Sequence, residues 1–272
     1  MEFKRFRIKS FIGVICAVST AALFSGFGII KDDNKDNNAP KEVTFKSNTP
    51  VSETGRNFET HIHNFYYSAG LDKSGLSIAA FEKGITGYYN IKATANSTIR
   101  VPILTIIDFT QKSTEKRLWV IDMVHSKLLY HTLVAHGKNS GEQYAEHFSD
   151  DEASNMSSLG FYLTGDIYFG KHGKSLVLDG LENGFNAHAK ERSVVMHAAD
   201  YVSEDFIQKI GRLGRSQGCP ALPPDVAPEI INTIADGSCL FIYYPDKQYE
   251  ESSSLLDAKV ATAAFEKSIE QK

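Results

Sequence analysis

The chain has 272 residues, a formal net charge of −4 and a sequence pI near 6.1. This charge gives no basic excess of the kind that nucleic-acid-binding domains carry, so we expect no nucleic-acid partner. Three cysteines are too few for a disulfide-rich scaffold. A chain of this length can instead bury a full hydrophobic core without such bridges.

The first 30 residues have the pattern of an export signal. Four basic residues between positions 4 and 9 precede an uncharged run from 10 to 30, and this order is typical of a secretory signal peptide. The run is also about 20 residues long, the length that a membrane-spanning helix requires. Residues 1–30 are therefore expected to be a signal peptide or a membrane anchor. Both alternatives place the rest of the chain outside the cytoplasm, in the periplasm or cell envelope.

Two segments with different patterns follow the leader. Residues 31–54 are charged, asparagine-rich and poor in large apolar side chains, which predicts a disordered linker. Residues 55–95 predict two helices. Phe58 and Ile62 fall on one face of the first, and Ser77 is the expected N-cap of the second. We expect this helical segment to pack beside the domain that follows.

Residues 96–246 have the pattern of a β-rich domain. The predicted strands are 101–109, 117–123, 127–135, 160–163, 175–178, 193–197 and 238–244. The second and third are expected to pair across a turn at 124–126, and residues 224–235 predict a helix. Because the pattern lacks βαβ alternation, it favours an α+β fold whose sheet is mainly antiparallel.

The final segment, residues 247–272, is charged and alanine-rich. Leu256, Val260 and Ala264 recur at a loosely helical spacing. We therefore expect a C-terminal tail that forms a short appended helix or a frayed end.

A cysteine and a histidine far apart in the sequence form a candidate nucleophile and base. Cys219 lies in a turn whose sequence, 216–221, is Ser-Gln-Gly-Cys-Pro-Ala, and His197 ends a predicted apolar strand. A free thiol is mostly protonated at neutral pH, so a nucleophilic cysteine needs a lowered pKa or an adjacent base. Imidazole can supply both. Arg212 and Arg215 are candidate sources of positive potential beside the thiol.

This arrangement resembles the signature of the L,D-transpeptidase catalytic domain, which has the YkuD-like fold. In that family a His-Gly, a spacer and a Ser/Thr-x-Gly-Cys follow one another; here the chain has His197-Ala198, a spacer with Gly211-Arg212-Leu213-Gly214, and Ser216-Gln217-Gly218-Cys219. More closely, the chain resembles the murein L,D-transpeptidase catalytic-domain subfamily. The segments that carry this likeness are 107–109, 113–122, 134–141, 158–162 and 180–182.

The resemblance implies a cysteine-dependent enzyme that acts on peptidoglycan peptide stems. Cys219 would be the nucleophile and His197 the base, with Ser216 and Gly218 shaping the catalytic loop. A backbone carbonyl near the cysteine motif would orient the imidazole, with Asp200 as an alternative. The enzyme would cleave a tetrapeptide stem after its L-centred diamino acid, form a thioester and transfer the stem to an acceptor amine. The resemblance also implies a covalent carbapenem adduct and no cofactor.

Two other functions stay open at this point. Water could resolve the same thioester, which would make the chain an L,D-carboxypeptidase or endopeptidase. Alternatively, the chain could be a non-catalytic cell-wall-binding module in which Cys219 is structural. Cys239 lies in an apolar run that predicts a buried strand. A disulfide between the two cysteines would use up the nucleophile, and the sequence leaves that pairing open.

Four residues are candidates for binding the substrate. Many family members have Arg or Asn where this chain has Ala221, and Arg215 is the candidate replacement. His136 precedes a glycine at the end of a predicted strand, and His172 lies in a glycine-bounded loop with aromatic neighbours, where substrate contacts are common. Tyr201, between the two halves of the motif, is the fourth. No three histidines have the spacing of a zinc site.

Overall fold

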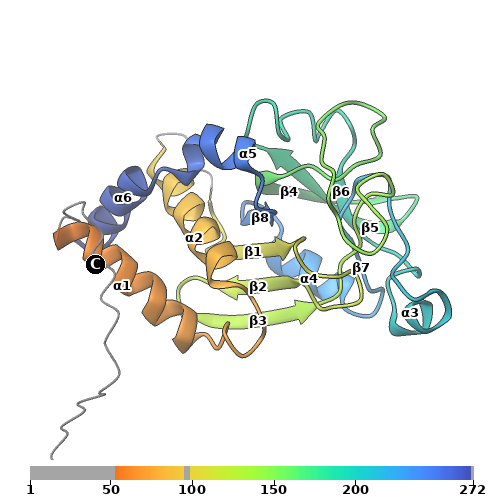
Figure 1. Cartoon of the computed structure of the whole chain (residues 1–272), viewed down its shortest axis with the longest axis horizontal. Helices are drawn as coiled ribbons and strands as arrows, with labels where there is room; N and C mark the ends of the chain where they lie inside the picture. The colour runs from red at the N-terminus through yellow and green to blue at the C-terminus, as the bar shows by residue number, and fades with distance from the viewer. Residues whose placement is uncertain (1–52, 95–98, 271–272) are drawn as a thin grey trace, which may run out of the picture. The chain divides into compact units, whose positions relative to one another are not determined.

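A computed structural model describes residues 53–94 and 99–270 (Figure 1). The predicted signal or anchor, residues 1–30, lies outside the described residues, and so does the predicted linker apart from its last two positions. Those two positions begin the first helix, α1, Glu53–Ser68. Among the described helices, none is both long enough and apolar enough to cross a membrane.

One sheet of eight strands forms the centre of the domain, in the order β3-β2-β1-β8-β4-β5-β6-β7. Its strands are β1 Ile103–Asp108, β2 Leu118–Asp122, β3 Lys127–Thr132, β4 Gly160–Gly170, β5 Gly173–Gly180, β6 Val195–Ala198, β7 Ala221–Leu222 and β8 Cys239–Tyr243. Only the β1–β8 and β6–β7 pairs of this order are parallel. The predicted α+β, mainly antiparallel fold is confirmed. Strand β7 was missed because two residues show no periodicity.

The two ends of the strand order approach each other, which gives the sheet a barrel-like form. Ala135, just beyond β3, forms a bridge with Ala221 of β7, and Gly137 forms one with Ser216. The Ser216 N–H donates to the carbonyl of His136 at 2.9 Å, and the Lys138 N–H donates to the carbonyl of Ser216 at 2.9 Å. The sequence that contains the candidate nucleophile therefore lies at the seam where the sheet begins to close.

The helices cover the two faces of the sheet. Helices α1, α2 (Ile78–Ala93) and α6 (Ala258–Glu270) gather on one side (Figure 1), where α2 contacts β1 and β8. Helix α4 (Ala227–Ile234) packs against β4, β5 and β6. A further helix, α3 (Glu204–Ile210), was not predicted; it begins after Ser203, whose hydroxyl accepts the Phe206 N–H at 3.3 Å.

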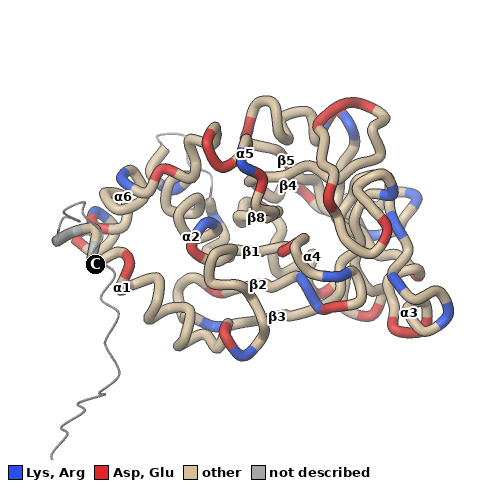
Figure 2. Tube along the Cα trace, in the orientation of Figure 1, with Lys and Arg blue, Asp and Glu red and all other residues tan. Residues whose placement is uncertain are grey.

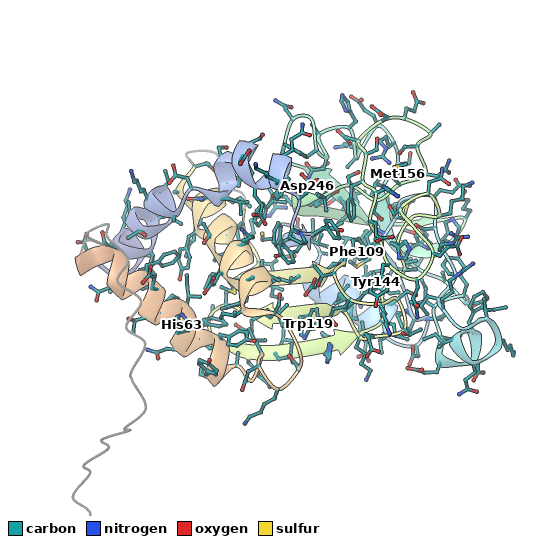
Figure 3. The ribbon with its side chains drawn as sticks, viewed as in Figure 1. His63, Phe109, Trp119, Tyr144, Met156 and Asp246 are labelled. Atoms are coloured by element: carbon teal, nitrogen blue, oxygen red, sulfur yellow. The ribbon has the colours of Figure 1, made fainter. Side chains whose placement is uncertain are left out.

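Helix α2 lies unusually close to the sheet. Ser77 is its N-cap, as predicted, and accepts the Ala80 N–H at 3.2 Å. A Cβ at Gly87 would lie 2.0 Å from the ring of Phe161, so only glycine allows this approach. Trp119 on β2 (Figure 3) donates its indole N–H to Ser74 at 3.0 Å, which ties the connection between α1 and α2 to the sheet. The helical segment thus shares one core with the strands.

The C-terminal segment forms helix α5 (Lys247–Ser252), a 3₁₀ turn (Ser254–Leu256) and α6. The helical spacing noted in the sequence does not mark its buried face: Val260 is 47% exposed, whereas Ala261 and Phe265 are buried. The ring of Phe265 decides this face, because it packs against Phe58 and Tyr89 with ring centroids 5.3 and 5.5 Å apart.

A buried carboxylate joins α5 to the sheet. Glu182, in the connection after β5, accepts the Phe161 N–H at 2.7 Å, the Tyr249 hydroxyl at 2.9 Å and the hydroxyl of Ser253. Burial raises the pKa of this carboxyl group above its usual value. Removing the carboxylate would leave buried donors without a partner, and each such donor costs free energy.

Replacing Glu182 with alanine is predicted to lower the free energy of unfolding by about 3 kcal/mol, because the Phe161 N–H and the Tyr249 hydroxyl lose their acceptor. Denaturant unfolding of the full chain measures the change. The exposed Glu115 provides the control, since Glu115→Ala should change stability by about 0.5 kcal/mol or less. Equal effects of the two substitutions would show that the buried carboxylate does not hold α5 in place.

Candidate active site

A cleft of about 600 Å³ opens beside the end of β6. Its walls come from the β4–β5 turn, the loop that precedes β6 and the segment between α3 and β7. Six of the predicted site residues line it: Cys219, His197, Ser216, Arg215, Tyr201 and His172. The fold thus brings the candidate nucleophile and base to one open groove.

The sulfur of Cys219 lies against the edge of β6. Cys219 is a free, partly exposed thiol. Its Sγ accepts the Val195 N–H at 3.5 Å and donates to the carbonyl of Ser193 at 3.7 Å. Cys239 is also free, and it is completely buried in β8 as the sequence predicted. The two cysteines therefore form no disulfide, and the thiol of the candidate nucleophile is free.

The loop that carries Cys219 is held by its own side chains and by the loop before β4. The Ser216 hydroxyl donates to the Cys219 carbonyl at 2.6 Å and accepts the Gly218 N–H at 3.0 Å. Gly218 has a φ of +124°, and a Cβ there would lie 2.7 Å from the carbonyl oxygen of Met156 (Figure 3). The Ser157 hydroxyl donates to the Gly218 carbonyl at 3.3 Å. Glycine is required here by both backbone conformation and space.

The imidazole of His197 is oriented by the backbone of its own strand. Nδ1 lies 2.8 Å from the carbonyl oxygen of Ala198, so Nδ1–H is the donor and Nε2 carries the free lone pair. The resemblance implied a carbonyl near the cysteine motif in this role; the structure shows one next to the histidine instead. Asp200, the alternative, is exposed in the turn that follows.

Burial sets the charge of both groups. It raises the pKa of the Cys219 thiol and lowers the pKa of the His197 imidazole from their ordinary values. Both groups are therefore neutral at neutral pH. The Val195 N–H and the charges of Arg192 and Lys171 favour the thiolate but do not outweigh burial. Of the two routes to a nucleophilic thiol, a lowered pKa and an adjacent base, the first is thus not found.

The positive charges near the sulfur are not the ones that the sequence suggested. Arg212 and Arg215 act on the buried His136 rather than on Cys219. Arg215 is held by Glu142 at 2.7 Å and donates to the carbonyls of Lys138 and Gly141, both at 3.0 Å. Its guanidinium is therefore largely committed to protein partners, although it lines the cleft.

Arg192 is a site residue that sequence reasoning missed. Its guanidinium donates to the carbonyls of Ser149 and Met156, both at 2.9 Å, and pairs with Asp150 at 3.4 Å. It is almost completely buried, and it lies behind Gly218 in the wall of the cleft. Arg192 therefore fixes the loop that meets Gly218 and adds positive potential near the sulfur. No motif surrounds it, so the sequence carried no signal for this role.

Tyr201 and His172 line the cleft together with His197. Burial raises the pKa of Tyr201 to about 12, so its hydroxyl is a neutral donor. A Cβ at Gly214 would lie 2.4 Å from Tyr201, which explains why a glycine precedes Arg215. His172, at the tip of the β4–β5 turn, stacks on the ring of His197 with centroids 4.3 Å apart.

His136 does not reach the cleft. Its side chain is completely buried, with Nδ1 2.7 Å from the guanidinium of Arg117 and Nε2 3.2 Å from the carbonyl of Gly141. Burial, together with the charge of Arg117, lowers its pKa to about 3. The backbone carbonyl of His136 accepts the Ser216 N–H and so contacts the loop that carries Cys219.

The described residues contain no group of three or more His, Cys, Asp or Glu side chains that could hold a metal ion. Charged residues of both signs are interspersed along the helices and loops (Figure 2), in keeping with the small net charge of −4.

The family model of the L,D-transpeptidase catalytic domain matches residues 72–243. The chain belongs to this family. The matched region contains α2, the complete sheet and both candidate reacting groups of this L,D-transpeptidase domain. A search of the curated proteins found no match.

Solved structures of L,D-transpeptidases resemble the chain only distantly. One from Mycobacterium smegmatis is 13% identical, with 53% of this chain and 59% of that one covered and a TM-score of 0.33. One from Mycobacterium tuberculosis H37Rv is 10% identical, with 53% and 58% covered and a TM-score of 0.34. The L,D-transpeptidase LdtMt1 in complex with imipenem is 13% identical, with 52% and 59% covered and a TM-score of 0.32. The chain spans less than two thirds of each.

Replacing Gly218 with alanine is predicted to lower the free energy of unfolding by about 3 kcal/mol, through backbone strain and a clash with Met156. Gly184 is the matched control, because it has a φ of +80° but open space where a Cβ would lie. Gly184→Ala should cost about 1 kcal/mol. Denaturant unfolding compares the two variants, and equal costs would contradict the close contact between the catalytic loop and Met156.

Proposed function

We propose that this L,D-transpeptidase domain cleaves peptidoglycan tetrapeptide stems through a thioester on Cys219 and transfers them to an acceptor amine. One observation carries the proposal: a neutral thiol and a neutral imidazole of fixed tautomer line the same open cleft. Family membership supports an acyl transfer on peptide stems. The geometry supports the assignment of roles to individual residues.

The first half-reaction begins with Cys219 protonated. As Sγ attacks the carbonyl carbon of the stem's L-centred diamino acid, the thiol proton moves to Nε2 of His197. The Nδ1–H bond to the Ala198 carbonyl holds the ring in the tautomer that can accept this proton. The Gly218 N–H is committed to Ser216. The N–H of Cys219 is therefore the proposed donor to the oxyanion.

Collapse of the tetrahedral intermediate breaks the bond between the diamino acid and the terminal D-Ala. The imidazolium of His197 returns its proton to the departing amine, which leaves a thioester on Cys219 and a neutral imidazole. In the second half-reaction the amine of another stem attacks the thioester carbonyl and His197 accepts the proton of that amine. The carbon–sulfur bond then breaks, and His197 passes this proton to the departing sulfur of Cys219. The products are a free Cys219 and a new amide crosslink, or an attached protein.

We further propose that the domain works outside the cytoplasm, in the periplasm or cell envelope, exported or anchored by residues 1–30. The support is the basic segment followed by an apolar run at the N-terminus. Peptidoglycan stems are accessible in that compartment. The thiol of Cys219 would also react there with a carbapenem, whose strained amide presents an electrophilic carbonyl to the same nucleophile.

Defined tetrapeptide muropeptides test the proposal with the full chain. The parent is predicted to release D-Ala and form crosslinked dimers, and one carbapenem mass should add to it. Cys219→Ala should abolish all three, and His197→Ala should slow dimer formation by at least about 100-fold. Cys239→Ala is the control, because its buried thiol lies outside the cleft and its removal should leave turnover unchanged.

Two outcomes would contradict the proposal in different ways. Shortened monomers without dimers would show that water resolves the thioester, so the chain would be a hydrolase. Release of D-Ala or carbapenem labelling in Cys219→Ala would show that Cys219 is not the nucleophile. Chromatography of the muropeptides and intact-mass spectrometry of the protein separate the two.

A further inference from the structure

One face of the His197 ring is covered by a second imidazole. The rings of His172 and His197 are stacked, with centroids 4.3 Å apart and planes 21° from parallel. His197 is only 3% exposed, whereas His172 is on the solvent side of the stack. The two rings come from different elements: His197 from β6 and His172 from the turn between β4 and β5.

The backbone beneath the stack fixes its geometry. Ser175 on β5 is the register partner of His197 on β6. The β4–β5 hairpin is therefore paired with β6 at the position of His197. The Ser175 hydroxyl donates to the Gly173 carbonyl at 3.2 Å. Gly173 has a φ of +74° and pairs with Gly170, which closes a two-residue turn of Lys171 and His172. This turn folds His172 back over the base.

From this arrangement we infer that His172 is a positioning residue whose ring holds the imidazole of His197 in place and keeps water from one of its faces. The inference rests on the proposed function, in which His197 is the base. Stacked aromatic rings favour one relative orientation, so the contact limits rotation of the His197 ring. Exclusion of water keeps the imidazole neutral, which is the form that accepts the thiol proton.

The same stack lowers the pKa of the His197 imidazole. Burial is the main cause of the lowered His197 pKa, and positive charge on His172 and Lys171 lowers it further. The ring of His172 covers His197 and its positive charge repels a second one, and both effects lower the pKa of His197. Removing this ring therefore raises the pKa of His197 toward its ordinary value. The other titratable or charged groups that line the cleft around the two rings are Tyr168, Lys171, Tyr201, Glu152, Glu191, Arg192, Arg215 and Cys219.

Kinetics of full-chain variants test the inference. His172→Ala is predicted to lower kcat about tenfold, equivalent to about 1.4 kcal/mol, with little change in KM. His172→Phe keeps a stacked ring and should retain most of kcat. Phe169→Ala, on the same hairpin but 79% exposed and outside the cleft lining, should behave like the parent. Two results for His172→Ala would overturn the inference. A raised KM with unchanged kcat would show that His172 contacts the substrate, and a raised kcat/KM would show that its ring blocks access to the cleft.

Titration of the His197 ring by NMR gives a readout that does not depend on turnover. In histidine-labelled full chain, with the signal assigned through His197→Gln, the midpoint is predicted to be lowest in the parent, higher in His172→Phe and highest in His172→Ala. Identical midpoints in all three proteins would overturn the inference. Retained activity of Cys219→Ala would instead refute the proposed function, so the two failures are distinguishable.

Discussion

The burial of His197 and the partial burial of Cys219 at the end of β6 are the constraint on which the account of this domain depends. Burial makes the charged form of both Cys219 and His197 unfavourable, so the thiol keeps its proton and the imidazole stays neutral. In the proposed mechanism the starting state is therefore not an ion pair. Proton transfer would accompany attack, and its efficiency would depend on the distance and orientation of the two neutral groups.

The surrounding structure fixes those two groups through backbone contacts. On the Cys219 side, the Ser216 hydroxyl closes the turn, while Gly218 fits against the loop that Arg192 holds. On the His197 side, the Ala198 carbonyl selects the tautomer. The segment after β3 supports the loop that carries Cys219, because the carbonyl of the buried His136 accepts the Ser216 N–H. Strand β7 follows this loop and pairs with β6, the strand of His197. Backbone carbonyls, the Ser216 hydroxyl and the Arg192 guanidinium thus hold the elements that carry Cys219 and His197.

Local sequence patterns were sufficient to predict much of the fold. Apolar and β-branched runs indicated seven of the eight strands, and Ser77 marked the start of α2 because capping depends on neighbouring residues. The pairing of Cys219 with His197 came from a motif. By contrast, the burial of His136, the stack of His172 on His197 and the role of Arg192 each depend on contacts between segments far apart in sequence. Periodicity holds no information on such contacts.

The pH dependence of Cys219 alkylation is the most direct test of the neutral resting pair. The rate of iodoacetamide labelling of the full chain is measured by mass spectrometry from acidic to strongly alkaline pH. Because burial raises the pKa of the thiol above its ordinary value of 9.0, labelling should be slow at neutral pH and rise with a midpoint above pH 9. His197→Ala should leave slow labelling at neutral pH. A midpoint below neutral pH in the parent that rises in His197→Ala would reveal a thiolate–imidazolium pair and contradict the account.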